Sequence, residues 1–165
     1  MPQLNKEAKH PVTINLNGKE VNGYAEPRML LTDFLTHEIG ITSCHVGCEH
    51  GVCGACTVLV DGNITRACLT FAVQADGCKI DTSESLADEN GELSGLQKAF
   101  KKHHGLQCGY CTTGVLMSIT AYLRESPNPT EEELRTVLSG HLCRCTGYVG
   151  MVKAVMDYCE NRPNK

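Results

Sequence analysis

The spacing of three cysteines constrains this chain more than any other feature of its sequence. Cys48, Cys53 and Cys56 form a C-x4-C-x2-C run, and Cys68 follows in the same half of the chain. This is the spacing with which plant-type [2Fe–2S] clusters are bound. The run therefore predicts a loop that wraps closely around two irons and two sulfides, with four thiolate ligands.

Glycines interleave these cysteines at Gly47, Gly51 and Gly54. A cluster loop needs backbone N–H groups that point at sulfur, close backbone approach and several positive φ angles, all of which glycine allows. A zinc knuckle is the alternative interpretation. Zinc usually takes paired C-x2-4-C elements, and one C-x2-C behind a C-x4-C fits that pattern poorly, so the iron–sulfur site is favoured.

A second group of cysteines lies in the other half of the chain. Cys108 and Cys111 form a C-x2-C pair, and Cys143 and Cys145 form a C-x-C pair. Because Cys108 and Cys111 are three residues apart, an initial helical turn would point both thiols the same way, and a helix N-terminus favours thiolate. These residues alone leave three occupants open, namely zinc, a [4Fe–4S] cluster or a [2Fe–2S] cluster.

The chain has 11 cysteines in 165 residues, and its environment decides between disulfides and metal. Disulfides need an oxidising compartment. The first residues carry neither an apolar stretch nor a twin arginine, which favours a cytoplasmic protein and metal ligation. The sequence contains no run of about 18 apolar residues, so no transmembrane helix is predicted. The formal charge of −4 and the lack of a basic run argue against nucleic acid as a partner.

Hydrophobic patterns divide the chain into a strand-rich half and a helical half. Alternation predicts strands at 12–16, 20–25, 57–60 and 79–81, with turns at Asn17-Gly18 and at 61–63, and helical spacing appears at 30–35. A polar, acidic stretch at 82–95 reads as the linker. Four helices are predicted around 96–100, 115–123, 130–140 and 152–161. The third would begin with a Thr130–Glu133 capping box and have Gly140 as its C′ residue. Asn161 and Pro163 would end the fourth.

Three stretches of the chain, 46–58, 107–114 and 142–148, resemble the signatures of one family. It is the small iron–sulfur subunit of the xanthine oxidase and carbon monoxide dehydrogenase type of molybdenum hydroxylases. The resemblance covers nearly the whole chain. Thr113 departs from it, because many relatives carry proline there, but this position is not a ligand.

The resemblance implies an α+β fold with two domains. Residues 1–85 would form a ferredoxin-like β-grasp domain and residues 86–165 a four-helix bundle. Both sites would then hold [2Fe–2S] clusters. The family's ligands match Cys48, Cys53, Cys56 and Cys68 at the first site and Cys108, Cys111, Cys143 and Cys145 at the second. The residues matching Gln107 and Cys145 touch the molybdopterin of the partner subunit in relatives.

The resemblance also implies a role in electron transfer and a set of partners. A large subunit would hold a molybdopterin centre, in its cytosine dinucleotide form, and a medium subunit would hold FAD. Electrons would pass from the molybdopterin centre through the two clusters to the FAD. The assembly would be a dimer of heterotrimers, and this chain would supply no catalytic residue. The rivals are a stand-alone ferredoxin-like electron carrier, which leaves the helical half unexplained, a zinc-binding interaction module, and an aldehyde oxidoreductase that lacks flavin.

Several residues near the two sites are expected to have structural roles. Cys44, Cys78 and Cys159 remain after the eight ligands are assigned, and they are interpreted as small buried hydrophobic residues. Eight cysteines suffice for two clusters, so histidine ligation of the Rieske type is not expected. Five histidines flank the sites, namely His45, His50, His103, His104 and His141.

Overall fold

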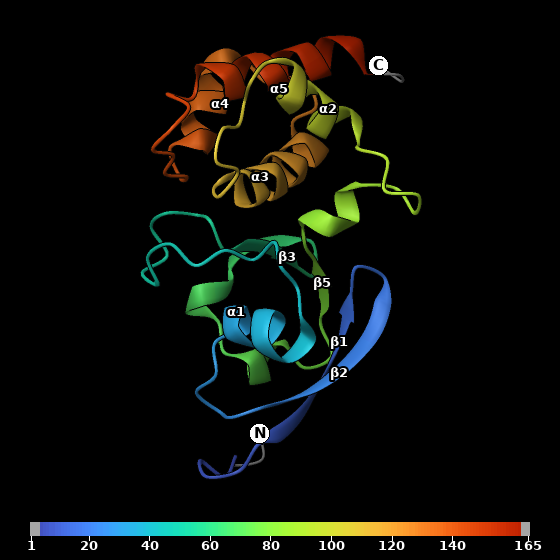
Figure 1. Ribbon diagram of the computed structural model, residues 1–165, viewed down its shortest axis with the longest axis vertical. Coiled ribbons are helices and arrows are strands. Elements are labelled where there is room, and N and C mark those ends of the chain that lie inside the picture. Colours follow the sequence, from blue (N-terminus) through green and yellow to red (C-terminus); the bar gives the residue numbers. More distant parts are fainter. Residues whose placement is uncertain (1–3, 163–165) are drawn as a thin grey trace.

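The structure is a computed structural model that describes residues 4–162. Its two halves stack along the long axis of the molecule (Figure 1), with the sheet in the N-terminal half and the main helices in the C-terminal half. Each half has its own hydrophobic cluster of buried side chains. The division into a strand-rich half and a helical half, predicted from the hydrophobic pattern, is confirmed.

The sheet is mixed and has five strands in the order β2-β1-β5-β3-β4. Their bounds are β1 His10–Leu16, β2 Lys19–Ala25, β3 Thr57–Val60, β4 Asn63–Arg66 and β5 Lys79–Asp81. β1 pairs with β5 in parallel, and the other pairs are antiparallel. Both residues of the predicted turn, Asn17 and Gly18, have positive φ angles of 52° and 83°, as the tightest hairpin turns require.

The sequence pattern missed β4, whereas the helical segment predicted after β2 is present. β4 was hidden because Asn63 was assigned to a turn and the strand's side chains are half-buried or exposed. The segment predicted as helical at 30–35 begins as α1, Leu31–Asp33, and continues as a π-helical turn, η1, Phe34–Ile39. Phe34 and Leu35 are completely buried and pack in the core beneath the sheet.

Three short 3-10 turns flank β5: η2 Ala67–Leu69 and η3 Ala72–Ala75 lie between β4 and β5, and η4 Ser83–Leu86 follows β5. Four helices then make up the C-terminal half, α2 Gly95–Lys102, α3 Thr112–Glu125, α4 Glu131–Leu138 and α5 Val149–Asn161. α5 packs against α2 and α4, and α3 packs against α4. Within residues 4–162, no helix is both long enough and apolar enough to cross a bilayer.

The ends of α4 and α5 test the predicted helix signals. The capping box at the start of α4 is confirmed, because the amide of Glu133 donates to the Thr130 hydroxyl at 3.3 Å and the Glu133 carboxylate accepts from the Thr130 amide at 2.7 Å. The helix ends at Leu138 with Ser139 as its C-cap, so Gly140 occupies the predicted C′ position, although its φ is not positive. α5 ends at Asn161 as predicted, and Pro163 lies outside the described residues.

Two backbones meet where the halves join. α3 packs on β3 (Figure 1), and its first turn carries Gly114. A Cβ atom on Gly114 would lie only 2.1 Å from the carbonyl oxygen of Gly54, in the loop that carries the first cysteines. Glycine is therefore required at position 114 by close approach of the two chains.

Glu84, in η4, ties the start of the linker to the segment before the first cysteine run. Its carboxylate accepts hydrogen bonds from the hydroxyls of Ser43 and Thr82 and from the Ser43 amide, the last at 3.3 Å. Burial opposes ionisation of this carboxyl, but the hydrogen bonds outweigh it and lower the pKa of Glu84 below its usual value of 4.5. The ionised side chain thus stabilises the folded N-terminal half.

We expect Glu84→Gln to lower the free energy of unfolding of the N-terminal half at pH 7. Since the folded pKa is lowered, the contribution of the carboxylate is complete above the ordinary pKa and is lost as the pH falls through the folded value. Urea unfolding of wild type and variant should therefore differ most at neutral pH, and the difference should shrink below pH 4.5. A difference that stayed constant with pH would contradict this role of the charge.

Candidate metal centres

The first group of cysteines is gathered from three successive segments. Cys48 and Cys53 lie in the loop before β3, Cys56 immediately precedes that strand, and Cys68 lies in η2. A hydrogen bond of 3.2 Å from the Ala67 amide to the Cys56 carbonyl joins the last two segments. Residues separated by up to 20 positions in the sequence are thereby brought to one end of the sheet.

Backbone N–H groups point at sulfur in this loop. The amides of Cys53 and His50 donate to the Cys48 thiol at 3.4 and 3.3 Å. These hydrogen bonds lower the pKa of Cys48 to about 6. A loop that stabilises a thiolate before any metal binds is suited to an anionic iron–sulfur cluster.

The four thiols of this site lie as two pairs. Cys48 interacts directly with Cys53, and Cys56 interacts directly with Cys68. Burial raises the pKa of Cys56 to about 12, and the nearby Cys68 thiol adds to the shift. A [2Fe–2S] cluster takes four cysteines, two on each iron, so the paired arrangement fits two irons.

The glycines of the loop act in two ways. Gly51 and Gly54 have positive φ angles of 73° and 75°, as expected for this loop. Gly47 does not, but a Cβ atom there would lie 3.0 Å from the Cys53 sulfur, so its small size leaves room for the thiol. Glu49 also has a positive φ, of 51°, which the sequence did not reveal.

The second group of cysteines comes from the N-terminus of α3 and from the loop that joins α4 to α5. Cys111 caps the N-terminus of α3, Cys108 lies before it, and Cys143 and Cys145 lie in the loop between α4 and α5. Gly109, with φ of 84°, separates Cys108 from Cys111, so the two thiols do not share a helical turn. The expectation that one turn would point both the same way was therefore wrong.

These four thiols also form two pairs, each with one cysteine from each motif. The sulfurs of Cys108 and Cys145 are 3.6 Å apart, and Cys111 interacts directly with Cys143. Burial raises the pKa of Cys111 to about 12. At Cys143 burial acts in the same direction, but hydrogen bonds from the side chain and amide of Thr146 outweigh it and lower the pKa of the thiol.

A cavity of about 280 Å³ opens at this second group and is lined by all four of its cysteines and by Cys53. Among residues 4–162, no three His, Cys, Asp or Glu side chains gather closely enough to surround a single metal ion. The thiols at each site lie in two pairs. This chemistry fits two [2Fe–2S] clusters.

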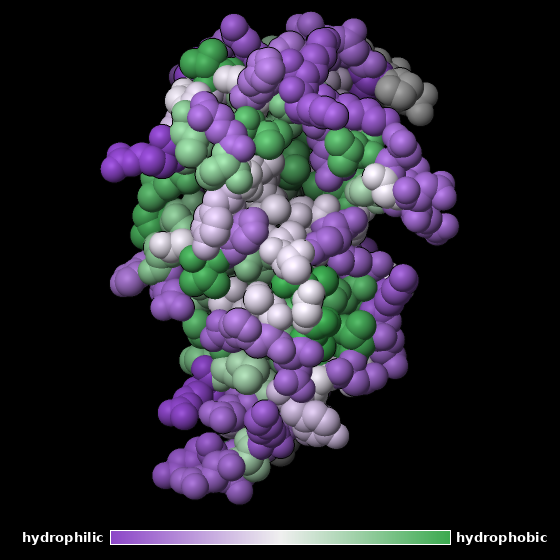
Figure 2. Space-filling view, viewed as in Figure 1, coloured by the Kyte–Doolittle hydropathy of each residue, from purple (hydrophilic) through white to green (hydrophobic). Residues whose placement is uncertain are grey.

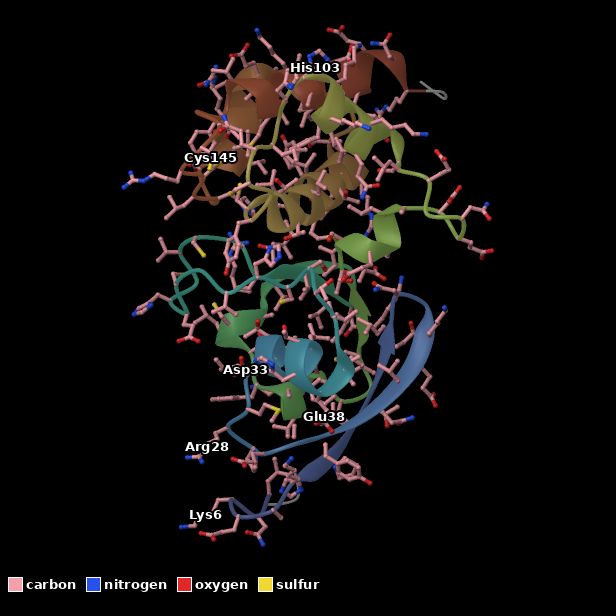
Figure 3. The ribbon with its side chains drawn as sticks, viewed as in Figure 1. Lys6, Arg28, Asp33, Glu38, His103 and Cys145 are labelled. Carbon is pink, nitrogen blue, oxygen red and sulfur yellow. The ribbon has the colours of Figure 1, made fainter. Side chains whose placement is uncertain are left out.

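Gln107 and Cys145 lie together on the outer side of the second group. The Gln107 amide nitrogen donates to the Cys145 carbonyl at 3.0 Å, and both residues are exposed. Figure 3 shows Cys145 at the left-hand edge of the helical half. The pair that the family resemblance assigned to a partner's cofactor is therefore accessible from outside the chain.

The two sites share a boundary that the sequence did not predict. The amide of Leu142, the residue before Cys143, donates to the carbonyl of Cys53 at 2.9 Å. The rings of His45 and Tyr110 stack with their centroids 4.5 Å apart, and the Tyr110 hydroxyl donates to the Val46 carbonyl at 2.7 Å. The loops that carry the two groups of cysteines are therefore in direct contact.

Four of the histidines near the sites contact other protein groups. His45 lies 2.8 Å from the Tyr110 carbonyl, His50 contacts the Cys48 carbonyl, and His103 pairs with Asp157 at 3.0 Å. His141 is buried and lies 2.8 Å from the Ser118 hydroxyl. Burial, with the nearby positive charge of Arg66, lowers the pKa of His141 to about 4, so its ring is neutral.

The three remaining cysteines differ in burial. Cys44 and Cys159 are buried, as interpreted from the sequence, and burial raises the pKa of Cys44. Cys78 is only half-buried, with its sulfur 4.0 Å from the Gln74 carbonyl. Cys44 lies 3.5 Å from the Thr32 hydroxyl, in the core of the N-terminal half rather than in the cysteine loop.

Comparisons with known proteins agree with this arrangement. A family model described as a 2Fe-2S iron-sulfur cluster binding domain matches residues 14–87, and one described as a [2Fe-2S] binding domain matches residues 82–156. The nicotine 6-hydroxylase small subunit of Paenarthrobacter nicotinovorans is 51% identical over 146 residues, which are 88% of this chain and 87% of that relative.

Two further similarities cover nearly the whole chain. Caffeine dehydrogenase subunit gamma of Pseudomonas sp. (strain CBB1) is 46% identical over 151 residues, which are 90% of each chain. Among solved structures, quinoline 2-oxidoreductase from Pseudomonas putida 86 matches with a TM-score of 0.89 and 47% identity, over 92% of this chain and 94% of the matched one. The N-terminal half shares the ferredoxin-like fold of these neighbours.

Proposed function

We propose an electron path for this chain, which belongs to the family of small iron–sulfur subunits of xanthine oxidase-type molybdenum hydroxylases. It carries electrons from a partner's molybdopterin centre to FAD in another partner subunit. The family makes the chain an electron-transfer component of an oxidoreductase. The path between particular partners goes beyond that and is argued from the sites.

The ligand sets proposed here are Cys48, Cys53, Cys56 and Cys68 for the first cluster and Cys108, Cys111, Cys143 and Cys145 for the second. When bound, each [2Fe–2S] cluster accepts and releases one electron at a time. The chain's own residues hold the thiols in pairs and direct amides at sulfur. No residue of this chain is proposed to act on the substrate.

One observation carries the proposal of a relay. The hydrogen bond from the Leu142 amide to the Cys53 carbonyl joins a proposed ligand of the first site to the neighbour of a proposed ligand of the second, Cys143. Electron transfer falls steeply with distance, so two redox sites in contact through one hydrogen bond can exchange electrons efficiently. A stand-alone ferredoxin would need only the first site.

The domain boundary and the helical fold belong to the same proposal. We place the ferredoxin-like β-grasp domain at 1–85 and the helical domain, as a four-helix bundle, at 86–165. The separation of the two hydrophobic clusters supports this boundary, because the first draws on residues up to Ile80 and the second begins with Leu86.

Exposed apolar side chains near both sites support docking of the two partners. Leu142 and Tyr110 beside the second site are 57% and 47% exposed, and Val52 and Leu69 beside the first are each 61% exposed. Figure 2 shows hydrophobic side chains at the surface along the left edge, on the side where Figure 3 labels Cys145. Apolar patches of this kind mark sites of protein association.

We accordingly propose that Gln107 and Cys145 face the molybdopterin, in its cytosine dinucleotide form, in a large subunit, and that the first site faces the FAD subunit. The assembly would be a dimer of heterotrimers in the cytoplasm. Nicotine, caffeine and quinoline appear in the names of the relatives, and all contain nitrogen heterocycles. A nitrogen heterocycle is therefore the proposed class of substrate for the complex.

Electron paramagnetic resonance (EPR) of the dithionite-reduced protein, with iron counted on the same sample, tests this function. We expect two distinct S = 1/2 signals that relax at different temperatures and about four irons per chain, since each cluster holds two irons. One signal with about two irons would contradict the relay and favour the stand-alone electron carrier. A colourless protein with bound zinc would contradict both.

A further inference from the structure

Arg66 lies at the junction of the two halves, at the end of β4 and two residues before Cys68. Its half-buried side chain makes contacts with three acceptors. Nη2 donates to the Gly140 carbonyl at 2.8 Å, Nε donates to the Gly51 carbonyl at 3.4 Å, and Nη1 donates to the Thr57 hydroxyl.

Each of these acceptors belongs to a different segment that carries proposed ligands. Gly51 lies between Cys48 and Cys53, Thr57 follows Cys56, and Gly140 begins the segment that leads to Cys143. A guanidinium is planar and presents its donors in a rigid fork, so it can hold several acceptors in one fixed geometry. A single side chain thereby links the backbone of both cysteine sites.

The segment 140–142 is held by the N-terminal half at each of its residues. Arg66 binds the carbonyl of Gly140, and the ring of His141 packs so closely on Gly54 that a Cβ there would lie 2.4 Å from its Nδ1. The Leu142 amide then donates to Cys53. Of these three contacts, the hydrogen bond from Arg66 is made by a charged side chain that reaches across the junction. Substitution of Arg66 can therefore remove it.

We propose that Arg66 is a positioning residue for electron transfer between the two clusters. It fixes the distance and orientation of the loop of 140–145 relative to the loop of 48–56, and the exchange of electrons depends steeply on that distance. This inference rests on the proposed function, since it requires both clusters. It assigns Arg66 no contact with substrate or metal.

The test is Arg66→Met in the complete complex, with Arg135→Met as the matched control. Arg135 is an arginine whose ion pair with Glu131, at 2.6 Å, lies within α4 and does not cross the junction. With both clusters reduced at low temperature, their magnetic interaction splits the EPR signals and reports their separation. We expect Arg66→Met to weaken or spread this splitting, with iron content and both spin counts unchanged.

Kinetics give the second readout. Rapid-freeze EPR after mixing with substrate should show slower passage of electrons from the second cluster to the first in Arg66→Met, and wild-type behaviour in Arg135→Met. Unchanged splitting and unchanged transfer in Arg66→Met would overturn the inference and leave the proposed function intact. A wild-type protein with a single signal would instead overturn the proposed function.

Arg66→Lys keeps the charge but replaces the fork with a single ammonium group, which cannot bind the three acceptors in the same plane. If Arg66→Met loses a cluster, Arg66→Lys is the variant to measure instead. We expect a weakened splitting in Arg66→Lys as well, because geometry rather than charge is proposed to matter. A splitting and a transfer rate equal to those of wild type in Arg66→Lys would overturn the inference.

Discussion

Cys143→Ser is expected to remove the second cluster, to leave the first in place, and to stop turnover of the complex. Cys143 pairs with Cys111 in the cavity of the helical half, and serine is a poor ligand for iron. Cys56 and Cys68 of the first site belong to the N-terminal hydrophobic cluster, whereas Cys143 packs against the C-terminal one. The iron content should therefore fall from about four to about two per chain.

EPR of the reduced variant, with iron counted and substrate oxidation measured in the reconstituted complex, checks this expectation. One S = 1/2 signal should disappear, and dithionite should still reduce the remaining cluster. Cys78→Ser is the control, because Cys78 is half-buried and belongs to neither group, and its sulfur lies 4.0 Å from the Gln74 carbonyl. Retention of both signals in Cys143→Ser would exclude Cys143 as a ligand, and loss of both would contradict the independence of the two sites.

The sequence predicted the elements whose pattern is local. The alternation at 12–16 gave β1, and the Asn17-Gly18 turn fixed its register with β2. The Thr130–Glu133 capping box located the start of α4. In each case the determining residues lie within a few positions of one another, so spacing alone is sufficient. β4 was missed because its four residues bury little surface and leave almost no periodic signal.

The metal centres could be predicted only in part. C-x4-C-x2-C is contiguous and identified the first loop, but nothing in the spacing says that Cys56 pairs with Cys68 or that Cys111 pairs with Cys143. These pairings depend on how η2 meets β3 and on how the loop after α4 meets α3. The resemblance to a family supplied the ligand sets, whereas the pairs came from the structure.

The junction between the halves could not be predicted at all. Arg66 lies outside every element and motif predicted from the sequence, and its partner Gly140 is 74 positions away. Gly140 itself was interpreted as a helix cap, a local role, while its carbonyl serves a distant guanidinium. Contacts between segments far apart in the sequence have no periodic or motif signature, so these contacts across the junction were invisible from sequence.

Gly114→Ala is expected to destabilise the junction, although the same change usually stabilises a helix. In a helix, alanine is more favourable than glycine by up to about 1 kcal/mol. Here the added Cβ would lie 2.1 Å from the Gly54 carbonyl oxygen and 3.1 Å from that of Ala55, both of them backbone atoms that no rotamer change can move. Overpacking a well-packed site costs about 1–3 kcal/mol, so the clash should outweigh the gain in helix propensity.

The sign of the change in stability is therefore the measurement, taken from thermal or urea unfolding of the cluster-loaded chain. Gly95→Ala is the control, because Gly95 also lies in the first turn of a helix and a Cβ there would meet only the ring of Tyr158, at 2.9 Å. That ring can turn aside, so we expect a change within about 0.5 kcal/mol. The clash at Gly114 also pushes α3 from the Cys53–Cys56 loop, so Gly114→Ala should weaken the splitting between the two EPR signals. A stabilised Gly114→Ala variant with unchanged splitting would mean that the halves do not meet through these two backbones.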